Sequence, residues 1–421
     1  MAELNIGKAP PNSTILPFYA TGAMVFWVLC LLLFLSADSL TTHFFNPHLL
    51  TIVHAAALGW GTMIIFGAAH QLLPVVCERD LFSPALGSLS WYSLFTGVLI
   101  LAASFWNFRV GWIMISGGIL VVISVIAFFI NSAFTSRIFS QLSPARLFIT
   151  TSAFWLGITV TIGLLLAINL STPFFTRNHL EILKLHAHAG LAGWFLQLVT
   201  GISSKLVPMF LLAKETKDRW MYRAAWLQNA GLILFLTDGY FFGIHPDRIL
   251  IYSILVAGGI ACWLYFLYDA FRHRLRKRID MQMRHTFTSF LFLLMAVVLI
   301  PVILFSGQSQ WALLYGTFLF MGWITGIILG MTFKTLPFIV WNGHYKMLSG
   351  KVKVPLPKDL YQESLLIWQY RVYLIAILLL GAGILSAQAI IIRIAALLWM
   401  IVASLYGYNV LKILLHKTKI E

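Results

Sequence analysis

Apolar stretches of about 20 residues recur along the whole chain and are separated by short polar segments. This is the length that a helix needs to cross the hydrocarbon core of a bilayer. The pattern predicts an all-α membrane protein with twelve transmembrane helices, with the alternative that the last two are partly fused. Residues 1–421 are expected to form a single polytopic membrane domain. The predicted spans lie at approximately 17–36, 49–74, 87–105, 110–133, 147–170, 185–212, 222–243, 249–270, 287–306, 311–340, 364–386 and 388–412.

The composition excludes several other classes of protein. Hydrophobic residues make up 60% of the chain and charged residues 10%, whereas soluble domains contain roughly 25% charged residues. A soluble enzyme, a disordered protein and a coiled coil are therefore excluded. The three cysteines have no CxxC spacing, so they indicate neither a disulfide framework nor a zinc site. The segment before Pro17 lacks the layout of a cleavable signal peptide, so the first apolar stretch is interpreted as a retained helix.

The net charge of +15 is explained by membrane topology. Of the 29 lysines and arginines, 21 lie on the side of the predicted membrane that holds both termini, and 5 lie on the opposite side. Basic residues concentrate on the cytoplasmic side of membrane proteins. We therefore expect a multi-pass protein of the bacterial inner (plasma) membrane with both termini in the cytoplasm. The charge indicates no nucleic-acid partner, and the expected surroundings are the lipid bilayer.

Three predicted helices, the second, sixth and tenth, share one residue pattern. A Gly-Trp pair is followed seven residues after the tryptophan by a glycine and fourteen residues after it by a proline. Four helices separate consecutive copies, which predicts three tandem four-helix repeats with threefold internal pseudo-symmetry about an axis along the membrane normal. The repeats span approximately 17–133, 147–270 and 287–412. The pattern residues are Gly59, Trp60, Gly67 and Pro74; Gly193, Trp194, Gly201 and Pro208; and Gly322, Trp323, Gly330 and Pro337.

The repeated glycines and tryptophans have structural interpretations. Small residues let helices approach closely in lipid, and the later glycine of each copy serves this purpose or makes room for a flat cofactor. The tryptophans lie too deep for the aromatic belt at the membrane surface. We expect them to pack at the centre of the bundle and not to act in redox chemistry.

Two histidines occupy the same register in two of the copies. His54 and His188 each lie six residues before the repeat tryptophan, near the outer ends of their helices, and the third copy has no histidine. Ionisable groups at membrane depth usually face a partner, a cavity or a cofactor, and imidazole is the commonest biological metal ligand. We therefore favour metal or haem ligation over hydrogen bonding between helices. His186 is a neighbouring candidate, but it lies roughly 200° around the helix from His188, so the two cannot reach one centre unless the helix begins between them.

These features resemble the catalytic subunit of the haem–copper oxidases, a superfamily that includes cytochrome oxidases and nitric oxide reductases. The resemblance covers nearly the whole chain in its architecture. It implies that His54 matches the second-helix histidine that binds the low-spin haem. It also implies that His188, or its neighbour His186, matches the sixth-helix ligand of copper or non-haem iron. The chain is similar in plan to the NnrS-type membrane haem–copper proteins associated with nitric oxide stress, through the pattern "HAAALGWGTMIIFGAAHQLLP".

The chain departs from the oxidase pattern in two helices. Neither the predicted seventh helix nor the tenth contains a histidine, although that family binds copper and both haems there. The resemblance therefore implies a cytochrome c oxidase subunit I-like protein that binds haem, with copper as a further possibility, and lacks the dihaem–copper centre. The expected role is respiratory electron transfer or nitric oxide or oxygen chemistry, with an electron donor or respiratory subunits as partners. The alternatives are a cofactor-free transporter or channel and a non-catalytic respiratory assembly partner.

Overall fold

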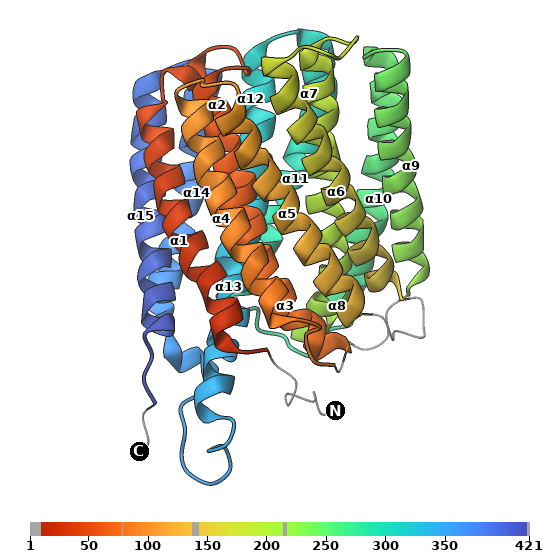
Figure 1. Cartoon of the computed structure of the whole chain (residues 1–421). Coiled ribbons are helices and arrows are strands. Elements are labelled where there is room, and N and C mark those ends of the chain that lie inside the picture. Colours follow the sequence, from red (N-terminus) through yellow and green to blue (C-terminus); the bar gives the residue numbers. More distant parts are fainter. Residues whose placement is uncertain (1–9, 78, 137–142, 214–216, 419–421) are drawn as a thin grey trace.

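The computed structural model describes residues 10–77, 79–136, 143–213 and 217–418, which form a bundle of long helices with no β-strand (Figure 1). The helices of the first third are α1 (Asn12–Leu35), α2 (Pro47–His54), η3 (Ala55–Thr62), α3 (Met63–Cys77), α4 (Pro84–Trp106) and α5 (Trp112–Thr135). Those of the second third are α6 (Pro144–Ser171), α7 (His179–His188), η4 (Ala189–Leu196), α8 (Gln197–Leu211), α9 (Arg219–Phe241) and α10 (Pro246–Arg272). Those of the last third are α11 (Met281–Ser306), α12 (Ser309–Thr317), η5 (Phe318–Ile324), α13 (Thr325–Tyr345), α14 (Glu363–Leu385) and α15 (Ala389–Leu414).

The chain is a multi-pass membrane protein, as the sequence predicts. Eleven helices of the described part are long and apolar enough to cross a bilayer. The remaining long helix is α9, which carries Arg219, Arg223 and Asp238 and packs along α10; the count of twelve spans therefore stays a prediction. The alternative in which the last two helices are fused is wrong. Helix α14 ends at Leu385, and Ala387, with φ of 51°, turns the chain before α15 begins.

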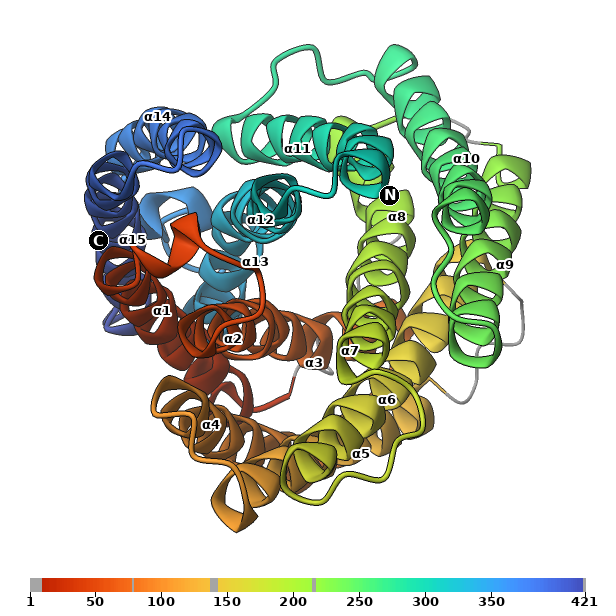
Figure 2. The ribbon, with the colours of Figure 1, turned by 90° about the horizontal axis from the view of Figure 1, so that it is seen from above.

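Three of the long helices contain a π-helical segment, which the sequence did not predict. Segments η3, η4 and η5 begin directly after His54, His188 and Thr317, which occupy the same register six residues before the repeat tryptophans. π-Helical turns are rare and occur frequently at functional sites. The three interrupted helices, α2–α3, α7–α8 and α12–α13, lie nearest the middle of the bundle, and the other helices surround them (Figure 2).

The glycine before each repeat tryptophan allows close contact with the preceding long helix. A Cβ atom on Gly59 would lie 2.7 Å from Val25 of α1. One on Gly193 would lie 2.6 Å from Trp155 of α6, and one on Gly322 would lie 2.7 Å from Phe292 of α11. These separations are shorter than van der Waals contact, so no larger residue fits without movement of the neighbour.

The later glycine of each copy packs in the same manner. A Cβ atom would lie 2.7 Å from Phe18 at Gly67, 2.5 Å from Phe148 at Gly201, and 2.6 Å from the Gln282 carbonyl oxygen at Gly330. Of the two uses predicted for these glycines, the structure shows close helix packing.

The three repeat tryptophans are buried, as predicted, with exposed fractions of 0%, 1% and 1%. Trp60 Nε1 donates to Thr325 Oγ1 at 3.0 Å, and Trp194 Nε1 donates to Thr62 Oγ1 at 3.1 Å. Each acceptor lies two residues after a repeat tryptophan in another copy. The residue in the third such position is Leu196, which has no hydroxyl group. Trp323 Nε1 is buried and has no partner among the described residues.

We expect Thr62→Val to destabilise the protein. The substitution keeps the side-chain shape but leaves the buried Trp194 N–H without an acceptor, which costs about 1–3 kcal/mol. The midpoint of thermal unfolding in detergent should fall, while Thr161→Val, at an exposed position of α6, should leave it unchanged. Equal midpoints for the two variants would show that the Trp194 hydrogen bond has no role in stability.

Basic residues gather at the end of the bundle where α1 begins and α15 ends. The segment between α13 and α14, which contains Lys346, Lys351 and Lys353, extends from this end (Figure 1). The basic segment after α10 is hydrogen-bonded to the segment after α8 through Leu275 N and Leu212 O at 3.3 Å. Lys8, Arg137, Lys214 and Lys419, four of the basic residues counted for the topology, lie outside the described residues.

Candidate functional site

A cavity of about 860 Å³ opens near the end of the bundle opposite these basic segments. Residues from the loops before α2, α10 and α12 line its mouth, and Thr62, Trp194 and Trp323 line its deepest part. Its size is that of a site for a cofactor or small molecule. Its walls are mostly apolar, and Lys184 is the one lysine or arginine among the described lining residues, none of which is acidic. The cavity therefore suits an uncharged or largely apolar ligand.

His54 lines this cavity at the end of α2. The Asn46 side chain accepts a hydrogen bond from Leu49 N at 2.8 Å, and with Pro47 this fixes the start of the helix two turns before His54. The Nδ1 atom of His54 lies 2.8 Å from the Leu50 carbonyl oxygen. A carbonyl only accepts, so Nδ1 carries the proton and Nε2 keeps a lone pair for a ligand.

His186 lines the same cavity from α7. Its Nδ1 donates to the carbonyl oxygen of Thr159 in α6 at 2.9 Å, so its Nε2 also keeps a lone pair. Gly163, one turn further along α6, makes room for the ring, because a Cβ atom there would lie 2.8 Å from Cε1 of His186. Metal-binding histidines usually donate their other ring N–H to a carbonyl or carboxylate in this way.

The structure brings His54 and His186 together. Their ring centroids are 6.3 Å apart and their planes differ by 16°. A centroid separation of this size leaves room for one metal ion between the rings, because a metal–nitrogen bond is roughly 2 Å long. The described residues contain no group of three or more His, Cys, Asp or Glu side chains placed to hold a metal ion. The protein therefore offers a pair of imidazoles at this point.

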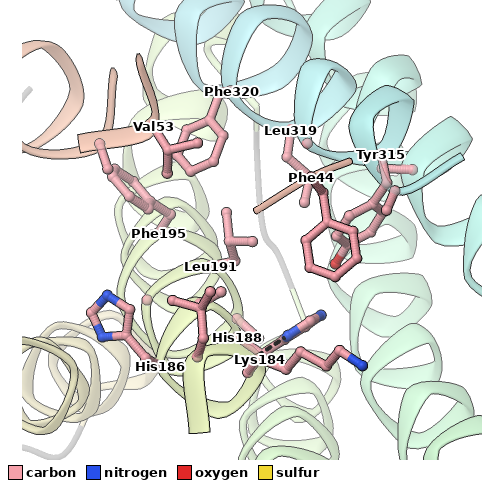
Figure 3. Close-up of a pocket in the computed structure, with 18 of the residues that line it drawn as sticks. Phe44, Val53, Lys184, His186, His188, Leu191, Phe195, Tyr315, Leu319 and Phe320 are labelled. Atoms are coloured by element: carbon pink, nitrogen blue, oxygen red, sulfur yellow. Dashed lines mark hydrogen bonds between the residues drawn. The ribbon is translucent and has the colours of Figure 1, made fainter. Parts of the chain in front are cut away.

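His188, which matches His54 in repeat register, lies on the other side of the cavity. Its Nδ1 donates to the Lys184 carbonyl oxygen at 2.8 Å, the same contact four residues back that His54 makes. Its ring centroid is 5.2 Å from that of Phe235 and 6.0 Å from that of Tyr315. Figure 3 shows His186 on one side of the cavity and His188 with Tyr315 on the other. The prediction that His186 and His188 point apart is confirmed.

Sequence reasoning missed several residues of the site. Lys184 was detectable as the residue one turn before His188, and Thr317 as the occupant of the histidine register in the third copy; both line the cavity. Tyr315, Thr159 and Gly163 carry no such signal, because only the packing of separate helices brings them to the histidines. Outside the lining, Asp238 forms an ion pair with Arg248 at 2.6 Å, which accounts for this half-buried carboxylate.

The comparisons with known proteins leave the site to be interpreted from its own geometry. No family model matches the chain, and no curated protein is significantly similar to it.

Proposed function

We propose that the protein is a membrane haem protein in which His54 and His186 would hold the haem. The observation that carries this proposal is the imidazole pair at 6.3 Å in an apolar cavity of about 860 Å³. Both rings donate from Nδ1 to a carbonyl oxygen, so both keep a lone pair on Nε2.

The number of ligands favours haem over a bare metal ion. Copper or zinc held by the protein alone takes three or four side-chain ligands, and the described residues place two imidazoles together. A porphyrin supplies four nitrogens and requires only axial ligands from the protein. The cavity walls keep water away from such a group, and this environment tunes its reduction potential.

Electron transfer is the activity that this arrangement supports best. Haem supplies one-electron chemistry when bound. His54 and His186 would both hold the group, so the site would carry electrons without binding oxygen or nitric oxide. We propose that the chain carries electrons in a respiratory membrane and does not reduce a gas at this centre. In this proposal His188, which lines the other side of the cavity, is not one of the two ligands.

We also propose that the chain consists of three tandem four-helix repeats, as in the haem–copper oxidase subunit I plan. Three observations support this: the π segments in one register, the glycine contacts with the preceding helix, and the tryptophan–threonine bonds that link copies. The excess of lysine and arginine at the end where α1 begins supports cytoplasmic termini in a bacterial inner membrane.

An optical spectrum with metal analysis tests the proposal. Protein purified in detergent from haem-replete cells should show a Soret band, and its iron content should approach one atom per chain. The oxidised and reduced spectra should be those of a low-spin haem and should not change on addition of carbon monoxide. Bound copper without a Soret band would overturn the haem assignment, and absence of both would favour a cofactor-free transporter or an assembly partner.

A further inference from the structure

The side of the cavity that holds His188 is chemically distinct from the side that holds the imidazole pair. His188, Tyr315 and Lys184 line it together, and Figure 3 shows the three side chains on the same side as Phe44. The residue one turn after Lys184 is His188, so both project from one face of α7. His186, on the opposite face, is directed to α6.

The hydrogen-bonding groups at this point form a donor–acceptor pair. His188 Nδ1 donates to the Lys184 carbonyl oxygen, so its Nε2 is an acceptor. The Tyr315 hydroxyl lines the same cavity and can donate a hydrogen bond to a ligand. The lone pair on His188 Nε2 repels a carboxylate oxygen. A phenolic hydroxyl instead donates a hydrogen bond to that nitrogen and accepts one from the Tyr315 hydroxyl. The pair thus fits the hydroxyl of a hydroquinone better than it fits an acid.

The walls around this pair are apolar and belong to the helices that are least covered by protein. In their most apolar stretches only 22% of the residues of α10 and 28% of those of α11 are buried, the lowest values among the membrane-spanning helices. One stripe of each helix lines the cavity, at the three- and four-residue spacing of a helix face. The two stripes are Ile249, Tyr252, Ser253, Val256, Ala257 and Ile260, and Leu293, Ala296, Val297, Ile300, Ile303 and Leu304.

We propose that this side of the cavity binds the head group of an isoprenoid quinol, which enters from the lipid between α10 and α11. The apolar stripes contact the ring and the first part of the tail, His188 Nε2 accepts a hydrogen bond from a quinol hydroxyl, and Tyr315 donates to the same oxygen. We expect the Lys184 ammonium to extend toward the aqueous mouth, as long basic side chains do at membrane surfaces. Quinol binding at this site does not depend on haem; only the role of the site in electron donation rests on the proposed function.

Equilibrium binding of decylubiquinol to the full-length protein in nanodiscs tests this site, read from quenching of tryptophan fluorescence under anaerobic conditions. Tyr315→Phe removes one hydroxyl and His188→Phe removes the acceptor while keeping a ring. Each should raise the Kd about five- to tenfold, the effect of losing one hydrogen bond in an apolar site. Tyr265→Phe is the matched control, because that tyrosine also lies on α10 but is 50% exposed and does not line the cavity; its Kd should stay at the wild-type value.

Two further measurements separate the possible outcomes. Ala257→Trp places a large side chain on the cavity-lining stripe of α10 and should lower the association rate of decylubiquinol. An unchanged rate would overturn entry between α10 and α11. Oleate is the competing probe: tighter binding of oleate that is lost in Lys184→Gln would overturn the quinol assignment in favour of a carboxylate ligand. If protein without a Soret band binds quinol, the quinol site is supported and the haem proposal is refuted. If protein with a Soret band does not bind quinol, only the quinol site is refuted.

Discussion

His54→Ala and His186→Ala are each expected to remove the haem from the purified protein. Each substitution deletes one of the two nitrogens at 6.3 Å ring separation, and the described residues place no third ligand beside them. Loss of an outer-shell partner alone lowers metal affinity roughly 10–100-fold, so loss of a direct ligand should lower it further. The ratio of Soret absorbance to protein absorbance should fall at least tenfold, as should the iron content.

Two controls distinguish ligation from a structural role. His43 also lines the cavity, but its Nδ1 accepts a hydrogen bond from Phe45 N at 3.1 Å, so its Nε2 carries the proton and is no ligand. His43→Gln should therefore retain the haem. Added imidazole should restore the Soret band of His54→Ala, because the free ring can enter the space left by the side chain. Full haem content in both alanine variants, or loss in His43→Gln alone, would contradict the assignment.

His188→Ala should keep a normal haem spectrum, although His188 is the histidine that the repeat register pairs with His54. Register places both residues at the same height in the bundle, and the structure agrees: each donates to the carbonyl four residues back, and each precedes a π segment. The repeat register does not determine which residue of α7 faces α2. That depends on the rotation of the helix about its own axis, which the contacts of His186 with α6 define.

The sequence predicts the helices well, because spans of a bilayer need long apolar stretches that short polar segments interrupt. The sequence gives less information about the centre of the bundle. Thr62 and Thr325 each lie two residues after a repeat tryptophan, and this spacing becomes meaningful only once Trp194 and Trp60 are seen to donate to them from other copies. The hydrophobic pattern does not predict the π segments. A widened helix of seven or eight residues needs no change from apolar to polar residues in the sequence.

Gly163→Ala should lower the haem content without lowering the stability of the fold. A Cβ atom on Gly163 would lie 2.8 Å from Cε1 and 3.3 Å from Nδ1 of His186, so the ring must move away from α6 and lose its bond to the Thr159 carbonyl oxygen. We expect severalfold less haem per chain and a shifted reduction potential in what remains, because a displaced axial ligand changes both.

Gly157→Ala isolates this effect from the general consequences of removing a glycine. It lies on the same helix, and its added Cβ atom would have no neighbour within 4 Å. Alanine stabilises a helix by about 0.8–1 kcal/mol relative to glycine, so Gly157→Ala should unfold at or above the wild-type temperature with full haem. If the haem loss in Gly163→Ala arises from the position of His186, then Gly163→Ala/His186→Ala should bind added imidazole and haem as well as His186→Ala alone. A free imidazole, unlike the tethered His186 ring, can shift away from the added methyl group. A double variant that binds less haem than His186→Ala would instead place the damage in α6 itself.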